Sequence, residues 1–455
     1  MEPTKPKWTK VAGNFMKIGL LGCGNVGLAL VQAIDRDRDN IREKTGVDLV
    51  LSMVAVRDKV KDRPGLPTST KLTDDPFSVV GDPDVDLVVE LIGGLDPARA
   101  LVSSALRAGK PVVTGNKELL AECWTELYQV AFDGGVDLLC EAAVAGAIPL
   151  VRALRESLAG DHITSLMGIV NGTTNYILTS MCENATTYEA ALGEAQRLGF
   201  AEANPSADVD GHDSAAKAAI MATIAFGQVV RKSDVYVEGI SKIDSKDFAI
   251  IDRLGYTIKL LAVAEAGLGP TDSRDPQGGL DRSRDISVRV VPAMIPKDHP
   301  LSGVRGSFNA VFLKGDLVGE MMLYGRGAGG PPTAAAVLGD IVDAAHNLTK
   351  NSSGRIKLSP PARLVENSQL SSQFFLSIDV DDRPGVLAMV AGIFGENNVS
   401  IRSMEQLGLG SEAHLVFLTH RALEIDLAKT LDRLTAAGPV KKVGNLLRVM
   451  DDDNL

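Results

Sequence analysis

The chain has 455 residues, of which 45% are hydrophobic and 23% are charged, an ordinary globular composition with room for about three domains of ~150 residues. Its net charge of −11 and its aromatic content of 4% argue against a nucleic-acid-binding protein, which usually has a basic face and aromatic side chains that stack on bases. The longest apolar runs are shorter than the ~18–20 residues that a membrane span needs. We therefore expect neither a nucleic-acid partner nor a membrane partner.

The cysteine pattern and the N-terminus favour the cytoplasm. The four cysteines form no CxxC pair and have no metal-ligand spacing from a histidine, so we expect free buried thiols in a reducing compartment. Residues 1–15 lack the apolar segment of a signal peptide, and we interpret them as a flexible tail.

From residue 16 the pattern alternates between short apolar strands and helices. A helix is expected over 26–44, and strands are expected over 16–22, 49–56, 86–93 and 111–117. This alternation predicts a parallel sheet with helices on both faces.

The segment GCGNVG (22–27) lies between the first expected strand and the first expected helix. Glycine permits a tight turn and the close approach of a pyrophosphate, which then lies at the helix N-terminus. This strand–turn–helix context favours dinucleotide binding over a merely structural turn. The residues expected to contact the cofactor here are Gly22, Gly24, Asn25, Val26 and Gly27.

The end of the second expected strand bears on which cofactor is used. An enzyme that prefers NAD usually places an acidic residue there, but Val56 is followed by Arg57, with Asp58 and Lys59 next to it. Arg57 can form charge-assisted hydrogen bonds with a 2′-phosphate, or it can be a solvated surface residue. We expect NADP, with NAD as the other possibility.

Two more polar residues follow expected strands of the parallel sheet, at its ligand-binding edge. Lys117 in TGNK could contact a substrate or the nicotinamide end of a cofactor, or it could be a surface lysine. Glu141 opens EAAVAGAIP (141–149), where small residues could let backbone carbonyls converge on a hard cation. The same segment could instead be a helix N-terminus with one acidic neighbour, and the pattern leaves both interpretations open.

The segment GFAEANPSADVDGHDSAAK (199–217) is the most specific in the chain. Asp213 and Lys217 are four residues apart at an expected helix start and therefore share one face. Glu202 and Asp208 lie in the loop before them. An ammonium group among three carboxylates can hold an amino-acid substrate and move a proton, whereas the alternative is a capped helix with a surface ion pair. We interpret His212 as a loop residue rather than a catalyst.

The rest of the chain divides into recognisable parts. Residues 267–287 are polar and predict a surface excursion, and residues 373–455 follow a βαββαβ order that is typical of ferredoxin-like folds. We expect strands over 287–295 and 309–316 and a helix near 334–346. The predicted domains are a Rossmann domain over 16–145 completed by 311–346, a middle domain over 146–310, a linker over 347–372 and a C-terminal domain over 373–455.

Six motifs occur in the order and spacing of the homoserine dehydrogenase family, which the chain resembles over about residues 16–346. They are GCGNVG, TGNKELL, CEAAVAGAIP, VNGTTNYIL (170–178), the segment 199–217 and YGRGAGGPPTA. The C-terminal segment, with DRPGVL (382–387), resembles an ACT domain. The stretch 267–287 is longer than the family pattern.

The resemblance implies an α/β fold with a Rossmann-type domain, an α+β substrate and dimerisation domain and a ferredoxin-like ACT domain. It also implies reversible NAD(P)H-dependent reduction of L-aspartate 4-semialdehyde to L-homoserine, in the biosynthesis of threonine, isoleucine and methionine. A homodimer or homotetramer is expected, with threonine as a possible effector at the ACT domain.

Residue roles also follow from the resemblance. Lys217 matches the proposed acid/base residue, and Lys117 matches a second active-site lysine that also contacts the cofactor. Glu202, Asp208 and Asp213 match substrate-binding carboxylates. The resemblance further implies a monovalent cation, usually sodium, held by Glu141, Val144, Gly146 and Ile148.

Two other functions remain open from the sequence. One is another ACT-bearing dehydrogenase, acting on a hydroxy acid or prephenate, which would need a catalytic histidine or arginine near the cofactor. The other is a regulator in which both parts only bind metabolites.

Overall fold

The computed structural model describes residues 15–267, 285–350, 352–353, 360–408 and 410–450. The expected tail (1–15) and excursion (267–287) lie almost entirely outside these residues. The chain divides into two compact units. One contains residues up to 160, 219–232 and 323–361, and the other contains 161–218, 233–322 and the remainder from 362. None of the described helices is long and apolar enough to cross a membrane.

The first unit contains a six-stranded sheet with the order β3-β2-β1-β4-β5-β6, and its neighbouring strands pair in parallel. This is the Rossmann order, and it reverses between β1 and β4. The four strands expected from the sequence are confirmed, each within a few residues. The strands are β1 (Phe15–Leu21), β2 (Asp48–Ala55), β3 (Lys71–Thr73), β4 (Leu87–Glu90), β5 (Val112–Thr114) and β6 (Leu138–Leu139).

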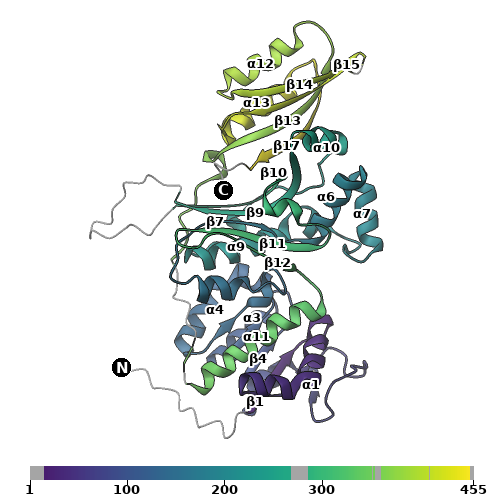
Figure 1. Cartoon of the computed structure of the whole chain (residues 1–455). Helices are drawn as coiled ribbons and strands as arrows, with labels where there is room; N and C mark the ends of the chain where they lie inside the picture. The colour runs from purple at the N-terminus through teal and green to yellow at the C-terminus, as the bar shows by residue number, and fades with distance from the viewer. Residues whose placement is uncertain (1–14, 268–284, 351, 354–359, 409, 451–455) are drawn as a thin grey trace, which may run out of the picture. The chain divides into compact units, whose positions relative to one another are not determined.

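Helices cover this sheet, and one of them comes from a distant part of the sequence. Helix α11 (Gly330–Thr349) lies beside α1 (Asn25–Thr45) in Figure 1, and its residues Val337 and Ile341 share a buried core with Ile18 of β1. The other main helices of the unit are α2 (Pro76–Gly81), α3 (Ala98–Arg107) and α4 (Lys117–Gly134). The sequence predicted the late helix but placed its start four residues after Gly330.

The second unit contains one long sheet with the order β12-β11-β7-β9-β10-β17-β13-β15-β14, with β8 beside β10 and β16 beside β13. Its strands before residue 330 are β7 (Ile163–Ile169), β8 (Tyr236–Val237), β9 (Tyr256–Ala266), β10 (Ile286–Pro296), β11 (Phe308–Gly315) and β12 (Gly319–Arg326). The helices near them are α6 (Gly172–Asn184), α7 (Tyr188–Arg197), α8 (Ser206–Val209), α9 (His212–Phe226) and α10 (Phe248–Arg253).

The C-terminal part has the βαββαβ order that the sequence predicted. Phe374, Phe394 and Phe417 form the centre of its core. Its elements are β13 (Ser371–Asp381), α12 (Val386–Glu396), β14 (Ile401–Gly408), β15 (Glu412–Thr419), β16 (Ala422–Leu423), α13 (Glu424–Ala436) and β17 (Val440–Val449).

The C-terminal sheet continues the sheet of the middle region. Strand β17 pairs in parallel with β10 through Ala293↔Arg448 and Met294↔Val449. The side chain of Arg448 is 2% exposed and forms ion pairs with Glu424 (2.8 Å) and Glu238. Residues 161–218, 233–322 and the part from 362 onward accordingly belong to one compact unit.

The middle region differs in detail from the sequence expectation. The loop expected to hold Glu202 and Asp208 contains the short helix α8, and His212 is the first residue of α9 rather than a loop residue. Strands β9 and β10 are buried along most of their length within the single chain.

Candidate active site

The glycine-rich turn after β1 has the geometry of a pyrophosphate site. Gly22 has a φ of +93°, and a Cβ atom there would lie 2.8 Å from the carbonyl oxygen of Leu91. A Cβ atom at Gly27 would lie 2.5 Å from the carbonyl oxygen of Gly22, whereas Gly24 faces open space. Helix α1 starts after Gly24 without a side-chain cap, so its first N–H groups are available to an anion.

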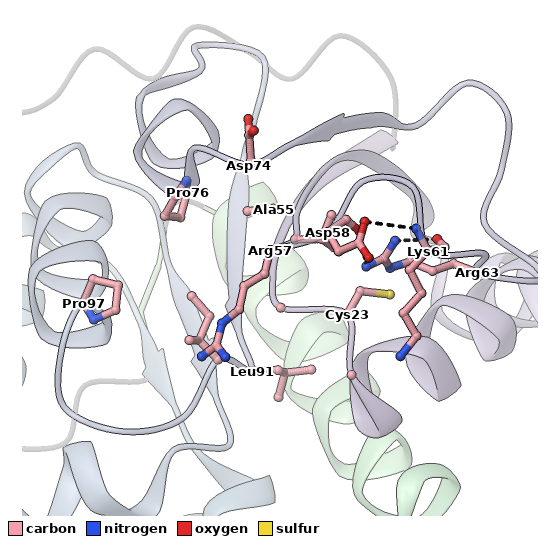
Figure 2. Close-up of a pocket in the computed structure, with 14 residues that line it drawn as sticks. Cys23, Ala55, Arg57, Asp58, Lys61, Arg63, Asp74, Pro76, Leu91 and Pro97 are labelled. Carbon is pink, nitrogen blue, oxygen red and sulfur yellow. Dashed lines mark hydrogen bonds between the residues drawn. The ribbon is translucent and has the colours of Figure 1, made fainter.

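A cavity of about 540 Å³ adjoins this turn and has several cationic side chains in its wall. Figure 2 shows Arg57, Lys61 and Arg63 around it, and Arg57 is exposed. The Asp58 carboxylate accepts the N–H of Val60 (2.8 Å) and is thereby engaged in its own turn. The cavity can therefore accept an anionic group.

Cys23 also lines this cavity, and all four cysteines are free, as expected. Only Cys140 is buried, so the expectation of buried thiols is wrong for the other three, which are partly exposed. Burial raises the pKa of the Cys23 thiol, and the nearby Arg63 partly offsets that effect. The sequence prediction missed Lys61 and Arg63, although four basic residues within positions 57–63 could have indicated them.

Lys117 is the first residue of α4, directly after β5 at the carboxyl edge of the sheet. Asn116 caps this helix by accepting the N–H of Leu119 (3.1 Å). The fully buried Glu90 at the end of β4 accepts the hydroxyl of Thr114 (2.6 Å) and the N–H of Ile92 (2.8 Å). Glu90 thus fixes the segments that follow β4 and β5. The sequence prediction missed this residue, although an acidic side chain in an apolar strand was an available signal.

The carboxylate of Glu141 is engaged at a helix N-terminus. Its two oxygens accept the N–H groups of Val151 (2.9 Å) and Arg152 (2.7 Å), and its side chain is buried. Burial raises the pKa of this carboxyl. The Glu141 side chain therefore acts as an acidic neighbour of a helix N-terminus. This leaves the main-chain carbonyls of the loop as the groups that could bind a cation.

Lys217 and Asp213 form a half-buried pair on α9. The Nζ atom of Lys217 donates to Oδ2 of Asp213 (2.7 Å) and to the carbonyl oxygen of Val170 (2.7 Å). The side chains are 12% and 9% exposed. Asp208 joins the group through Asn171, whose Nδ2 donates to Asp208 (2.7 Å) and Asp213 (2.9 Å). The cluster therefore contains one ammonium in contact with one carboxylate, and a second carboxylate linked to them by Asn171.

Glu202 lies apart from this cluster in the structure. Its side chain is exposed, and its backbone carbonyl accepts a hydrogen bond from Gln196 (3.1 Å). The sequence prediction brought Asp208, Asp213 and Lys217 together but missed Asn171. The motif VNGTTNYIL contained Asn171, and an asparagine before a helix was the available signal.

The Rossmann order, the glycine turn and the cationic cavity, together with a lysine–carboxylate cluster, define an NAD(P)-dependent oxidoreductase. Comparisons with known proteins make this specific. Residues 22–141 match a family described as homoserine dehydrogenase, NAD binding domain, residues 149–342 match homoserine dehydrogenase, and residues 374–439 match the ACT domain. The chain belongs to the homoserine dehydrogenase family.

Relatives match along nearly the whole chain. A homoserine dehydrogenase of Corynebacterium glutamicum is 44% identical over 446 residues, which cover 97% of each chain. One from Bacillus subtilis is 40% identical, covering 95% of this chain and 98% of the relative. The crystal structure of a homoserine dehydrogenase from Thiobacillus denitrificans has a TM-score of 0.87 at 36% identity, covering 96% of this chain and 98% of that chain.

These findings establish the activity of a homoserine dehydrogenase, an oxidoreductase with an NAD(P)-binding domain and a C-terminal ACT domain. They confirm the expected fold and family. The alternatives of a hydroxy-acid or prephenate dehydrogenase and of a metabolite-binding regulator are set aside.

Proposed function

We propose that Lys217 is the acid/base residue in the reduction of L-aspartate 4-semialdehyde to L-homoserine. The bound nicotinamide cofactor supplies the hydride to the aldehyde carbon. Lys217 donates a proton to the carbonyl oxygen, and in the reverse direction its neutral amine accepts the hydroxyl proton. The observation that carries this proposal is that Nζ of Lys217 bonds Val170 and Asp213, which leaves its third N–H for a substrate oxygen.

The carboxylates near Lys217 are proposed to hold the ammonium group of the substrate. Asp208 and Asp213 lie in the cluster, and Glu202 would join from its exposed loop by a change of position on binding. Lys117, at the carboxyl edge of the sheet, is proposed as a second lysine toward the substrate and the nicotinamide end.

We propose NADP as the preferred cofactor. Arg57, Lys61 and Arg63 line the cavity, and Asp58 is engaged in its own turn rather than directed to a ribose hydroxyl. A hyperthermophilic archaeal homoserine dehydrogenase solved in complex with NADPH has a TM-score of 0.59 at 27% identity, covering 73% of this chain and 98% of that chain. NAD remains the alternative.

A monovalent cation, sodium, is proposed in the loop after Glu141, held by main-chain carbonyls. Ala145 and Gly146 have φ values of +56° and +57°, a double left-handed turn that redirects consecutive carbonyls. Within the described part of the chain, no backbone N–H donates to the carbonyls of Val144 or Gly146. The fit is partial, because the carbonyl of Ile148 accepts the N–H of Leu150 (2.8 Å) and the Glu141 carboxylate is occupied.

The ACT domain is proposed to bind an amino-acid effector, with threonine as the first candidate. A cavity of about 400 Å³ lies where β13 leads into α12, and it is lined by Asp382, Arg383 and Gln406 among others. An arginine and a helix N-terminus can bind a carboxylate, and an aspartate can bind an ammonium group. The alternative is that the ACT domain only scaffolds the enzyme.

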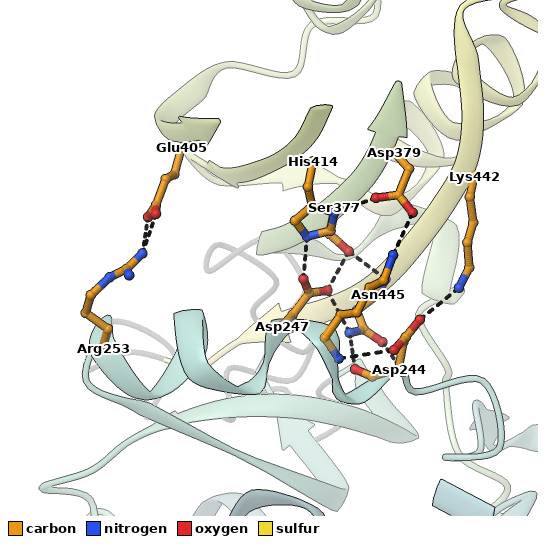
Figure 3. Close-up of polar contacts among 10 residues, drawn as sticks. Asp244, Asp247, Arg253, Ser377, Asp379, Glu405, His414, Lys442 and Asn445 are labelled. Carbon is orange, nitrogen blue, oxygen red and sulfur yellow. Dashed lines mark hydrogen bonds and ion pairs between the residues drawn. The ribbon is translucent and has the colours of Figure 1, made fainter. Parts of the chain in front are cut away.

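The strands beneath this cavity offer a connection to the substrate region. Ala413 and Leu415 line the cavity, and His414 between them contacts Asp247, which precedes α10 (Figure 3). Effector binding couples to activity only if the effector binds two states of the protein with different affinities. Arg383→Ala should abolish inhibition by millimolar threonine and leave the basal rate unchanged. If threonine, isoleucine and methionine all fail to inhibit the wild-type enzyme, the effector role is excluded and only the scaffolding role of the ACT domain is left.

Three wider expectations also remain proposals. We propose a homodimer or homotetramer, a place in the biosynthesis of threonine, isoleucine and methionine, and a cytoplasmic location that suits four free thiols. Sedimentation velocity of the purified enzyme tests the assembly state.

Absorbance at 340 nm tests the reaction and the cofactor together. Homoserine-dependent formation of NADPH, with a higher kcat/KM for NADP than for NAD, is the expected result. A higher kcat/KM for NAD would overturn the cofactor proposal while leaving the reaction in place.

A further inference from the structure

Asn171 contacts two acidic residues of the cluster at once. It lies between β7 and α6, and it is 5% exposed. Its Nδ2 donates one hydrogen bond to Oδ1 of Asp208 (2.7 Å) and one to Oδ2 of Asp213 (2.9 Å). An amide nitrogen has two hydrogens, so both of its donors are used by carboxylates.

The other side of the amide fixes its orientation. The Oδ1 atom of Asn171 accepts the N–H of Thr174 (2.9 Å), which caps the N-terminus of α6. A rotated amide would direct its oxygen at two carboxylates and its nitrogen at a backbone N–H. Both contacts would be repulsive, so only one orientation is stable.

The residue before Asn171 holds the ammonium of the same cluster. The carbonyl oxygen of Val170 accepts a hydrogen bond from Nζ of Lys217, which also donates to Oδ2 of Asp213. Two consecutive residues of one loop therefore hold the base and its carboxylate partner. The Oδ2 atom of Asp213 is shared between Asn171 and Lys217.

The start of α6 is itself firmly held. Asn175 lies one turn after Asn171, is 1% exposed, and donates to the carbonyl of Gly306 (2.9 Å). Its Oδ1 accepts a hydrogen bond from the buried Lys259 (3.2 Å). These contacts connect α6 to β9 and to the segment before β11. The amide of Asn171 therefore projects from a well-anchored helix start.

The electrostatics of the cluster require donors of this kind. Two carboxylates face one ammonium, so the carboxylates repel each other. Hydrogen bonds donated by Asn171 stabilise the negative charges of both carboxylates. Without the amide, Asp208 and Asp213 would move apart, and Asp213 would no longer hold Lys217 in one position.

We propose that Asn171 is a positioning residue for proton transfer, acting through Asp208 and Asp213 to fix the orientation of Lys217. The proposal rests on the roles proposed above for Lys217 and Asp213. In this proposal Asn171, which caps α6, contributes to catalysis as well as to the stability of that helix.

Two substitutions separate positioning from capping. Asn171→Ser and Asn171→Asp both keep a side-chain oxygen that can cap α6, but both remove the two N–H donors. We expect kcat/KM for homoserine to fall by about 10- to 100-fold, as for other residues that orient a catalytic group. The decrease should be larger for Asn171→Asp, which places a third carboxylate in the cluster.

The pH profile gives a readout that a structural role would not change. Loss of the donors leaves two carboxylates beside Lys217 without the amide between them, so the pH profile of kcat/KM should change in Asn171→Ser. The dissociation constant of NADPH, measured by fluorescence, should stay unchanged. The combined variant N171S/D213N should lose little more activity than D213N alone, because both changes act through the same carboxylate.

Thr187→Ala is the matched control, since Thr187 caps the neighbouring helix α7 through Ala190 and contacts no member of the cluster. It should lower the melting temperature without moving the pH profile. The proposal is overturned if Asn171→Ser behaves like Thr187→Ala, or if the effects of N171S and D213N multiply. A parallel Lys217→Ala variant with near-normal kcat would instead overturn the proposed function.

Discussion

The Nε2 atom of His414 in β15 lies 2.7 Å from Oδ1 of Asp247, which precedes α10 in the substrate region. The other ring nitrogen, Nδ1, lies 2.6 Å from Oδ1 of Asp379 in β13. A neutral imidazole has only one N–H, so donation to both carboxylates requires the protonated ring. Figure 3 shows this imidazole between the two aspartates.

The contacts of His414 with Asp247 and Asp379 predict that the free energy of unfolding decreases as the pH rises. Burial alone lowers the pKa of His414, but the hydrogen bonds that the ring donates to Asp379 and Asp247 outweigh it, so the pKa is raised above 6.5. The stability that the protonated ring contributes is complete below pH ~6.5 and is lost as the pH rises through the folded-state pKa. Urea unfolding between pH 5.5 and 8.5 should show a steeper decline for the wild type than for His414→Gln.

His420→Gln is the control, because His420 is exposed at the end of the same strand. It should keep the pH dependence of the wild type. If the free energies of unfolding of the wild type and His414→Gln change in parallel with pH, the protonated ring of His414 does not contribute to stability.

Cofactor preference should depend on Arg57. If its guanidinium binds a 2′-phosphate, Arg57→Ala raises the KM for NADP by about 10- to 100-fold, the scale of ~1.5–3 kcal/mol for a charged hydrogen bond, and changes the KM for NAD much less. Lys44→Ala removes an exposed charge near the C-terminus of α1, distant in sequence from the cavity, and should change neither value. Equal effects of Arg57→Ala on both cofactors would exclude a phosphate contact.

Removal of the ACT domain should destabilise the rest of the chain. Asp247 is 1% exposed, and its carboxylate contacts Ser377 (2.6 Å), His414 (2.7 Å) and Asn445 (2.7 Å), all in the C-terminal part. Deleting 373–455 would remove these partners and would leave β10 without β17. We expect poor soluble yield and a lower melting temperature, whereas an equally stable truncated enzyme would show that the junction contributes little.

The sequence predicted the parts of the fold whose patterns are local. The glycine turn, the alternating strands of the Rossmann unit and the βαββαβ order each depend on neighbouring residues. The junction could not be predicted in this way, because it joins Asp247 to His414 and Asn445 across more than 160 positions. The pairing of β10 with β17 likewise leaves no signal in either strand alone.

The candidate site shows the same division. The spacing of Asp213 and Lys217 predicted their contact, because four residues make one helical turn. Asn171 and Glu90 were missed, since their roles depend on which loops converge in space. The pattern around Glu141 left two interpretations open, and it did not show that the carboxylate accepts the N–H groups of Val151 and Arg152.

The kcat of Lys217→Ala with saturating homoserine and NADP tests the central claim most directly. Removal of a general acid/base should lower kcat by about 10²- to 10⁴-fold. The dissociation constant of NADPH should remain that of the wild type, because Lys217 is assigned to the substrate oxygen. A variant that binds NADPH normally and retains near-normal kcat would contradict the assignment of Lys217 to proton transfer.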